Sequence, residues 1–354
     1  MPNTTFREIN QLVPNYVYGD AISNQAAEIQ RYLVNSGYIS NIYTCYPDKK
    51  RENHIAINKN NLPHGKPLLY HYSMGSPANK YALEHQGAKC FFYHNITPPS
   101  FIAPFDHELA SRLQKGLDEL GSFAAHFPVS AGDSAYNAEE LRKNGFIEPE
   151  VLPIIINKPE KKIDDELFEQ LHDGRINILF VGRIAPHKKQ EDLIHFFSHY
   201  LNFESNARLI VVGKPESGNP YFLSLKKIID QLKLNEKIFF TGAVSTEQLN
   251  SLYLSASLFV SMSEHEGFCA PLIEAMWRDI PVLAYKAAAV PETLGKAGVI
   301  FNDKSNLNEL AALAHLIIND KELHNKIIDA QKRRRNDFLP EVVLKKLDDI
   351  IQKL

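Results

Sequence analysis

The sequence predicts an α/β protein made of two doubly wound units, each with a parallel sheet covered by helices on both faces. The first observation is length, because 354 residues exceed the usual single-domain core. The second is that strand-like apolar runs alternate with helical patterns, which is typical of parallel sheets. The third is a charged segment at 157–173 that separates two such series and reads as a domain boundary.

Apolar runs and helical periodicity define the elements of the first unit. Its predicted strands are residues 7–13, 40–45, 67–72, 88–94, 123–130 and 151–156. Its predicted helices are residues 21–36, 79–86, 105–120 and 136–144. Gly37 and Gly145 directly follow the first and last of these helices, where glycine commonly ends a helix. Residues 14–20 are expected to form a loop.

The second unit shows the same alternation. Its predicted strands are residues 176–181, 208–212, 237–240, 257–261, 281–284 and 298–301, with helices in the gaps. Residues 307–354 are predicted to be mostly helical, with a break near Pro340. These patterns predict domains at residues 1–158 and 159–337, followed by a last helix at 338–354.

Composition excludes several classes of function. A formal net charge of −3 gives no argument for nucleic acid as a partner. Cys45, Cys90 and Cys269 are far apart, so neither a zinc site nor a disulfide framework is indicated, and a reducing cytoplasm fits. No basic-then-apolar segment opens the sequence and no apolar run approaches about 18 residues, so neither a signal peptide nor a membrane span is expected. Attachment to a membrane surface stays open.

Missing motifs narrow the chemistry further. The sequence has no G-x-G-x-x-G after its first predicted strand and no G-x-x-x-x-G-K-[ST], which argues against a dinucleotide dehydrogenase or a P-loop enzyme. It also has no convincing D-x-D motif, which argues against a metal-dependent sugar transferase. We therefore expect no metal and no other cofactor.

A pair of glutamates frames one predicted strand-to-helix loop. Glu266 lies in the loop, and Glu274 lies about one turn into a helix that Pro271 opens. Gly267 lets the backbone approach a ligand closely, the helix start favours an anion, and carboxylates accept hydrogen bonds from sugar hydroxyls. The pattern therefore suits a sugar–diphosphate–ribose ligand. The alternative is that Glu266 is a solvated loop charge and Glu274 a helix-dipole charge.

A basic loop follows the predicted strand at 176–181. Its sequence is V-G-R-I-A-P-H-K-K, and it places Arg183 and Lys188 where both can reach the carboxyl end of the sheet. Cations held there would stabilise negative charge on a leaving diphosphate more in the transition state than in the ground state. Lys189 follows directly, so which lysine is used stays open. The alternative is a solvated basic loop.

These two motifs together resemble the family 4 retaining glycosyltransferases, also called group 1 glycosyltransferases. E-G-F-C-A-P-L-I-E-A-M matches the E-x7-E motif, and V-G-R with a lysine five positions after the arginine matches the basic one. The resemblance is strongest over about residues 175–302. It implies the GT-B fold, in which two Rossmann-like doubly wound domains face each other across a cleft and the last helix crosses back to the first domain.

The resemblance also implies roles for single residues. Arg183 and Lys188 would stabilise the leaving diphosphate, Glu266 would hold the sugar hydroxyls, and Glu274 would hold the ribose. The remaining donor-side residues would act largely through their backbone: Gly267, Phe268 and Cys269 through N–H groups, and Gly242 and Val244 in the loop that holds the nucleotide base. Residues 289–292 resemble another donor-side loop, in which Glu292 is open to a structural reading.

In the first unit the resemblance points to three residues. His94 at the end of a strand would contact the transferred sugar, although a hydrogen-bonded structural histidine is the alternative. Gly19 would lie near the diphosphate, and Asp20 would contact the acceptor or act as a base.

A basic run extends from Lys332 to Arg335 in a predicted helix. It is interpreted either as a solvated helix face or as a patch attracted to anionic lipid.

The resemblance thus implies a retaining hexosyltransferase. It would move a sugar from a nucleotide-diphosphate donor to a hydroxyl of a glycan or lipid-linked acceptor, as in the synthesis of bacterial surface polysaccharide or lipopolysaccharide. The expected location is the cytoplasm, with peripheral contact at the inner face of the membrane left open. Two alternatives remain: a nucleotide-sugar epimerase or hydrolase of the same fold, and a non-catalytic nucleotide-sugar-binding subunit.

Overall fold

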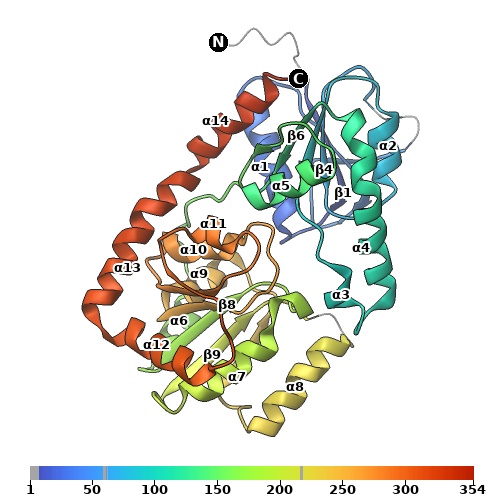
Figure 1. Ribbon diagram of the computed structural model, residues 1–354. Coiled ribbons are helices and arrows are strands. Elements are labelled where there is room, and N and C mark those ends of the chain that lie inside the picture. The colour runs from blue at the N-terminus through green and yellow to red at the C-terminus, as the bar shows by residue number, and fades with distance from the viewer. Residues whose placement is uncertain (1–7, 59–60, 62, 216–217) are drawn as a thin grey trace. The chain divides into compact units, whose positions relative to one another are not determined.

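The chain folds into two α/β units, each built on one parallel sheet (Figure 1). The computed structural model describes residues 8–58, 61, 63–215 and 218–354. Unit 1 contains the described parts of Met1–Pro99, Glu108–Ile155 and Phe338–Leu354, and unit 2 contains those of Ser100–His107 and Ile156–Asp337. The predicted α/β class with two doubly wound sheets is confirmed.

The sheet of unit 1 has the order β3-β2-β1-β4-β5-β6-β7, and all its pairings are parallel. Its strands are β1 Asn10–Tyr16, β2 Ile42–Pro47, β3 His54–Ala56, β4 Leu68–Tyr72, β5 Lys89–Tyr93, β6 Val129–Gly132 and β7 Glu150–Val151. The strand order reverses between β1 and β4. In sheets of this kind, ligands bind beyond the carboxyl ends of the strands at such a reversal.

Helices cover this sheet and supply its core. They are α1 Ala21–Asn35, α2 Ala78–Glu84, α4 His107–Leu120, the 3₁₀ helix Gly121–His126, α5 Ala135–Lys143 and α14 Pro340–Ile351. The short α3, Pro99–Ile102, precedes α4, and all of it except Pro99 belongs to unit 2. In α1 the apolar positions 26, 29 and 33 repeat at helical spacing and are fully buried. Val343 and Leu347 of α14 pack into the same core as Ile29 and Leu33, so α14 belongs to this unit.

The first strand differs from its predicted bounds. Its expected start, Arg7, lies outside the described residues, whereas its end extends through Pro14 to Tyr16, so the loop predicted from residue 14 is wrong there. Proline cannot donate to a sheet ladder. Pro14 interrupts no hydrogen bond between strands here, because the pairing of β1 with β4 stops at Leu12. The Pro14 carbonyl accepts a hydrogen bond from Thr44 Oγ1 at 3.2 Å.

Two apolar runs of unit 1 that were predicted to be strands form little strand, although many of their residues are buried. Phe123 and Phe127 pack with Tyr70 and Phe91 in one aromatic cluster, with ring centroids 5.2–6.0 Å apart for three of these pairs. The strand predicted over 123–130 is therefore reduced to β6, after a 3₁₀ helix. Likewise β7 has only two residues, and the buried residues 152–156 that follow it form no strand.

The sheet of unit 2 has the order β10-β9-β8-β11-β12-β13 and is parallel throughout. Its strands are β8 Ile176–Val181, β9 Ala207–Val212, β10 Ile238–Gly242, β11 Leu258–Ser261, β12 Val282–Tyr285 and β13 Val299–Phe301. Every predicted strand of this unit is present, with ends shifted by at most two residues. The order reverses between β8 and β11, the two strands that precede the predicted basic and glutamate loops.

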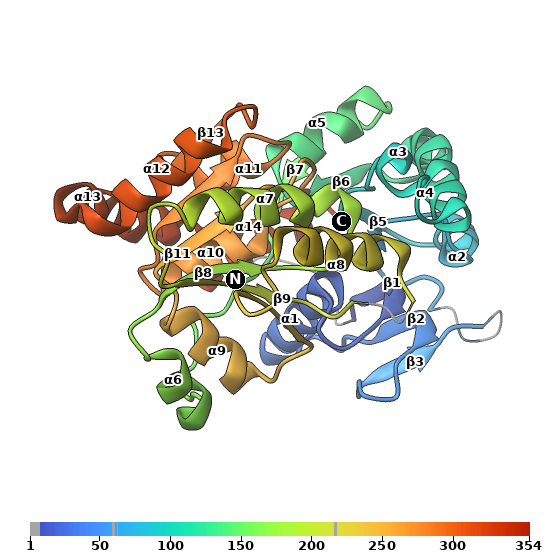
Figure 2. The same ribbon diagram turned by 90° about the horizontal axis from the view of Figure 1, so that it is seen from below.

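The helices of unit 2 flank this sheet. They are α6 Asp165–Leu171, α7 Gln190–Tyr200, α8 Pro220–Leu232, α9 Thr246–Leu254, α10 Ala270–Trp277, α11 Val290–Leu294, α12 Leu307–Asn319 and α13 Lys321–Arg334, with 3₁₀ helices at Pro186–Lys188 and Arg335–Phe338. Figure 2 shows α7 beside α12 and α6 beside α9. Ile194, Phe197, Ala311 and Ala314 are fully buried where α7 and α12 meet the sheet.

Two segments of unit 2 were not expected from the sequence. The charged boundary segment contains α6, whose N-cap Asp164 accepts a bond from the backbone of Leu167, so its acidic residues open a helix. Residues 100–107 also belong to this unit, because Phe105 packs on its core with its ring 5.2 Å from that of Tyr221. In the parts of the chain described, no helix combines the length and apolarity that crossing a bilayer requires.

Candidate functional site

The predicted basic loop and glutamate loop lie side by side in unit 2. The basic loop follows β8 and the glutamate loop follows β11, and these two strands are paired in parallel. Parallel neighbours end at the same edge of a sheet, so both loops emerge together at the point where the strand order reverses. The topology therefore places the residues of both motifs in one site.

Lys188 and Glu266 form the centre of this site. Lys188 Nζ lies 2.7 Å from Glu266 Oε2, and the two side chains are only 15% and 7% exposed. Lys189 points elsewhere, with its ammonium 3.3 Å from Glu191 and 3.6 Å from Glu264. Lys188 is thus the lysine that contacts the glutamate motif. An ammonium has three donors, so Lys188 can keep Glu266 and still offer a hydrogen bond to an anion.

The residues between the two glutamates form a tight turn into α10. Cys269 is the helix N-cap with φ 70° and ψ 62°, a left-handed conformation that favours glycine. Pro271 sits at the start of α10, as the sequence predicts. Burial first, and then the adjacent Glu266 carboxylate, hold the pKa of the Cys269 thiol well above its usual range. Cys269 is therefore a protonated thiol that turns the backbone.

The segment 289–293 holds the glutamate loop from the other side. The backbone N–H of Ala289 donates to the carbonyl of Glu266 at 3.1 Å, and Thr293 Oγ1 donates to the carbonyl of Phe268 at 2.6 Å. Glu292 lies in the first turn of α11. This segment orients the backbone of residues 266–268, while a direct contact of Glu292 with a donor stays a prediction.

Glu274 is held by a buried tyrosine. The hydroxyl of Tyr253 donates to Glu274 Oε2 at 2.6 Å, and Tyr253 is fully buried. Burial first, and then the charge of Glu274, raise the pKa of this hydroxyl well above its usual range, so it remains a donor. Arg278 lies 4.4 Å over the ring of Tyr253 and donates to the carbonyl of Glu274 at 3.0 Å. The Glu274 carboxylate thus has a fixed direction, and it is only partly buried.

The Arg183 side chain is exposed, and hydrogen bonds of Gln190 hold its loop in place. Gln190 Nε2 donates to the Arg183 carbonyl at 2.8 Å, and the Gln190 backbone N–H donates to the hydroxyl of Tyr221 at 2.9 Å. Among the described residues no carboxylate forms an ion pair with the Arg183 guanidinium. This side chain therefore presents a cation to solvent, as an anion-binding role requires.

The histidine between the two cations is neutral. Burial first, and then the charges of Lys188 and Arg183, hold the pKa of His187 well below its usual range. Its ring lies 6.5 Å from that of Phe101 and is buried. The positive charge of this loop therefore resides on Arg183 and on the two lysines rather than on His187.

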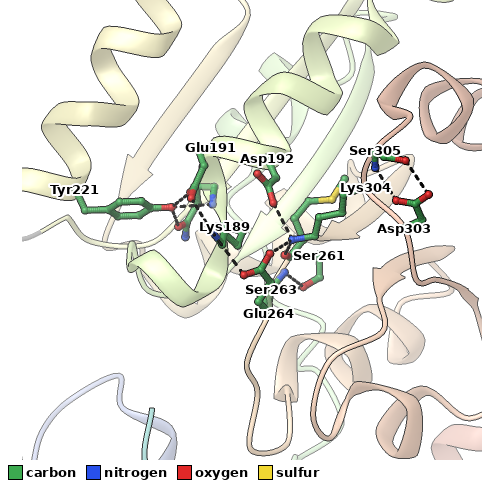
Figure 3. Close-up of polar contacts among 12 residues, drawn as sticks. Lys189, Glu191, Asp192, Tyr221, Ser261, Ser263, Glu264, Asp303, Lys304 and Ser305 are labelled. Carbon is green, nitrogen blue, oxygen red and sulfur yellow. Dashed lines mark hydrogen bonds and ion pairs between the residues drawn. The ribbon is translucent and has the colours of Figure 1, made fainter. Parts of the chain in front are cut away.

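A second charge network, not predicted from the sequence, supports both loops (Figure 3). Lys304 Nζ lies 2.7 Å from Asp192, 2.9 Å from Glu264 and 2.9 Å from the carbonyl of Met262. These residues come from the segment after β13, the start of α7 and the loop after β11. The ammonium also lies 4.3 Å over the ring of Tyr285. Position after a strand is the only sequence signal for Lys304, and many surface lysines share it.

Glycines end three neighbouring strands of this sheet. A Cβ on Gly213 would lie 2.0 Å from the carbonyl oxygen of Gly182, so only glycine fits where the chain leaves β9. Gly242, at the end of β10, has φ 72° and open space around it. Val244 is partly buried in the following loop. The structure thus brings Gly242 and Val244 to the same sheet edge as the basic loop, while their contact with a base stays a prediction.

In unit 1, Gly19 and Asp20 lie in the loop between β1 and α1. Gly19 has φ 78° and no atom within 4 Å of the Cβ position, so its surroundings are open. Asp20 is the N-cap of α1: Oδ2 accepts from the Ser23 backbone at 3.0 Å and from Ser23 Oγ at 2.9 Å. These bonds give Asp20 a structural role as a helix cap. Its predicted role toward an acceptor, and that of Gly19 toward a diphosphate, stay predictions.

His94 has both ring nitrogens engaged within unit 1. Nδ1 lies 3.0 Å from each carboxylate oxygen of Asp133, and Nε2 lies 2.8 Å from Nδ1 of His71. The side chain of His94 is only 1% exposed. The hydrogen-bonded reading of this histidine therefore describes the structure, and its predicted contact with a sugar would need one ring nitrogen to be released.

The basic run on α13 is only partly a solvated face. Arg334 donates to the carbonyl of Thr293 at 3.1 Å, and Arg335 donates to the carbonyl of Met276 at 2.9 Å and pairs with Asp279 at 2.8 Å. Arginines near helix ends satisfy free carbonyls in this way. The reading as a solvated face or lipid patch is therefore wrong for Arg334 and Arg335, which fasten α13 to α10 and α11.

Comparison with known proteins gives the family. Residues 162–334 match the family described as glycosyl transferases group 1. The matched segment contains the basic loop, both glutamates and the Lys304 network. The family predicted from the two motifs is confirmed.

Two curated relatives carry specific names. The chain is 28% identical to the MMP alpha-(1->4)-mannosyltransferase of Mycolicibacterium hassiacum over 217 residues. This match covers 60% of this chain and 50% of that protein. It is 27% identical over 192 residues to the capsular polysaccharide biosynthesis glycosyltransferase CapM of Staphylococcus aureus, covering 53% and 49%. The chain spans about half the length of the curated relatives it matches.

Solved structures show the fold over nearly the whole chain. Anabaena HepE in complex with UDP-glucose superposes with a TM-score of 0.80 at 15% identity, covering 98% of this chain and 100% of that one. The sucrose-phosphate synthase of Thermosynechococcus elongatus gives a TM-score of 0.77 at 15% identity, covering 98% of each. The predicted GT-B class is thereby confirmed.

Proposed function

We propose that this chain is a retaining glycosyltransferase that moves a hexose from a nucleotide-diphosphate donor to a hydroxyl group of a glycan or lipid-linked acceptor. The observation that carries the proposal is the pairing of Lys188 with Glu266 at 2.7 Å, at the reversal point of the sheet in unit 2. It joins the two motifs in one site. A ligand that needs both a cation for phosphate and a carboxylate for hydroxyls fits this arrangement.

The chemistry follows from the charges of the site. Breaking the bond between sugar and diphosphate leaves negative charge on the leaving phosphate. Arg183, with a planar fork of donors, and Lys188, with a compact charge, would stabilise that charge as it develops. Glu266 would accept hydrogen bonds from sugar hydroxyls and Glu274 from the ribose, while the backbone of residues 267–269 would face the phosphates. Because side chains supply the positive charge, we propose that the reaction needs no metal.

The named relatives favour polysaccharide or glycolipid synthesis as the setting. One is a mannosyltransferase, one acts in capsular polysaccharide synthesis, and the HepE structure holds UDP-glucose. We therefore propose a nucleotide sugar as the donor, with a growing surface glycan as the acceptor on the cytoplasmic side of the membrane. The identity of the base and of the hexose are outcomes of the experiment below.

Two other functions would use the same residues. An epimerase or hydrolase would release an altered or free sugar without any acceptor. A binding subunit would hold the nucleotide sugar and leave it unchanged. Both motifs are intact and Arg183 is exposed for binding, which favours catalysis over binding alone.

The test begins with a thermal-shift screen of nucleotide sugars, since a ligand that binds only the folded state raises Tm. The stabilising donor, labelled in its sugar, is then incubated with lipid-linked and soluble glycan acceptors, with and without EDTA. We expect label in the acceptor, retained anomeric configuration and unchanged rates with EDTA. Labelled free sugar or epimer formed without acceptor would support the enzymatic alternative, and bound but unchanged donor would support the binding subunit.

A further inference from the structure

Four polar side chains form one buried chain across the sheet of unit 1. Gln11 on β1, His71 on β4, His94 at the end of β5 and Asp133 after β6 follow the order of the strands. Gln11 Oε1 lies 3.0 Å from His71 Nε2, His71 Nδ1 lies 2.8 Å from His94 Nε2, and His94 Nδ1 lies 3.0 Å from both oxygens of Asp133. All four residues are buried, Gln11 and His71 completely.

The two imidazole rings lie edge to edge. Their planes differ by 3° and their centroids are 5.0 Å apart. A contact of 2.8 Å between two ring nitrogens fits this separation only if the rings are nearly coplanar, with an N–H of one aimed at the lone pair of the other. One ring nitrogen of this contact therefore carries a proton and the other does not.

Gln11 decides which nitrogen that is. Its Nε2 donates at 3.0 Å to the carbonyl of Ala26, an oxygen that can only accept, so the amide cannot be turned round. The amide oxygen therefore faces His71 Nε2 and requires a proton there. Burial first, and then the neighbouring His94, hold the pKa of His71 well below its usual range, so this ring is neutral. A neutral ring protonated at Nε2 has a bare Nδ1, and the bridging proton belongs to His94 Nε2.

The other nitrogen of His94 faces Asp133. Both carboxylate oxygens lie at the same distance from Nδ1, 3.0 Å, which is the geometry of one N–H shared between the two oxygens of an ionised carboxylate. Burial raises the pKa of Asp133 and the His94 partner opposes this shift, so an ionised Asp133 needs a cation beside it. Among the described residues, only the ring of His94 forms an ion pair with it.

We infer that Gln11 and His71 are positioning residues that fix the direction of this hydrogen-bond chain, so that His94 is held as an imidazolium paired with Asp133. Both ring N–H groups of His94 then donate within unit 1, and the ring has no lone pair for a sugar hydroxyl. Among the described residues, the ionisable groups within hydrogen-bond distance of this ring are His71 from β4 and Asp133 from the segment after β6. The ring of Phe92 packs against His71, with centroids 5.4 Å apart. The pair carries no net charge, which suits its burial.

The inference bears on the proposed function only through His94, and it is tested without any substrate. Protein labelled with ¹⁵N in its histidines is examined by long-range ¹H–¹⁵N correlation at about pH 8, where an ordinary histidine, with a pKa near 6.5, is neutral. The two rings are assigned by the signals missing from His71→Gln and His94→Gln. We expect protons on both nitrogens of His94 and on Nε2 alone of His71. A bare nitrogen on His94 would overturn the inference.

Gln11→Met tests the direction of the chain. Without the amide oxygen, His71 is expected to move its proton to Nδ1 and donate to His94, and His94 then loses one proton at about pH 8. Gln30→Met is the matched control, because Gln30 also donates to a backbone carbonyl, that of Ser40 at 2.9 Å, but touches neither histidine. A His94 that keeps both protons in folded Gln11→Met would contradict the role of Gln11.

Asp133→Asn supplies a second, independent variant in case Gln11→Met does not fold. It removes the negative partner while keeping the size of the side chain, so the His94 ring should lose a proton and become neutral. Retention of both His94 protons in Asp133→Asn would overturn the proposed ion pair. Donor binding is measured on the same samples, so that the inference about His94 and the proposed glycosyltransferase function can fail separately. If His94 loses a proton while the donor still binds, the proposed function stands.

Discussion

The ammonium of Lys188 lies 2.7 Å from the carboxylate of Glu266, and this contact joins the loop after β8 to the loop after β11. Both side chains are largely buried. A buried charge that loses its partner is strongly destabilising, whereas removal of both charges is much better tolerated. The pair therefore keeps two opposite charges in place beside each other before any ligand arrives.

The first prediction concerns this pair. Lys188→Met leaves Glu266 buried without its cation and should lower the free energy of unfolding by about 3 kcal/mol. The double variant Lys188→Met/Glu266→Gln should recover a large part of this loss. Urea denaturation measures both, and Lys326→Met in the exposed Lys326–Glu322 pair is the control, with a change below about 0.5 kcal/mol. Equal losses in the single and double variants would show that the ion pair is not the cause.

The second prediction compares two buried tyrosines. Tyr253→Phe removes the bond to Glu274 and should cost about 1.5–3 kcal/mol, the range for a hydrogen bond to a charged group. Tyr200 is the matched control, since its hydroxyl is buried with no hydrogen-bond partner in the described parts of the chain. Tyr200→Phe should be neutral or stabilising. Thermal unfolding of both variants is the measurement, and an equal cost in both would argue against a specific role of Tyr253.

The third prediction concerns the network around Lys304. Lys304→Met leaves Asp192 and Glu264 facing each other without their shared cation, and it should lower the free energy of unfolding by about 2 kcal/mol. Because this network supports the loop that carries Glu266, affinity for the stabilising donor should fall as well. Lys346→Met, at an exposed position of α14, is the control for loss of a lysine charge. Unchanged affinity in Lys304→Met, measured by calorimetry, would confine Lys304 to stability.

The fourth prediction is a pH dependence of stability. Burial lowers the pKa of His85 to about 4, and its Nε2–H donates to the Lys66 carbonyl at 2.8 Å. Its Nδ1 is buried with no partner among the residues described, so a proton there has no acceptor. Below a pH of about 6.5, His85 binds a proton in the unfolded chain but stays neutral in the folded protein. The free energy of unfolding therefore falls as the pH drops from about 6.5 to about 4.

His85→Gln is the variant that checks this window. It should reduce the fall in unfolding free energy between these two pH values, since glutamine does not titrate, while His71 and His187, whose pKa values burial also lowers, still contribute. His315→Gln, at a partly buried helix position beside Asn319, should leave the fall unchanged. The same slope in His85→Gln and in the unchanged protein would assign the pH dependence to other groups.

How much could be predicted from the sequence depends on how local each feature is. Lys188 and Glu266 were predictable as one site, because each lies in a short motif after a strand and parallel strands end at one edge. Lys304 was not, because its partners come from segments more than 35 positions away. The buried chain from Gln11 to Asp133 was missed for the same reason, since it depends on the order of four strands.

Other misses come from tertiary packing that overrides local pattern. Phe123 and Phe127 lie in an apolar run that resembles a strand, yet they are buried in an aromatic cluster. Pro14 marks a loop by its chemistry but continues β1, because the pairing of β1 with β4 has already ended at Leu12. In the basic run, helical spacing correctly predicted α13, whereas the bonds of Arg334 and Arg335 to neighbouring helices could not be predicted from charge alone.

The central claim is that positive side chains of unit 2 stabilise a leaving diphosphate, and the turnover of Arg183→Ala tests it most directly. With the identified donor at saturating concentration, kcat for sugar transfer should fall by about 10²–10³, the cost of one lost transition-state contact. Arg333→Ala, at an exposed position of α13, should transfer sugar at the normal rate. An unchanged kcat for Arg183→Ala, with only KM for the donor raised, would contradict the claim.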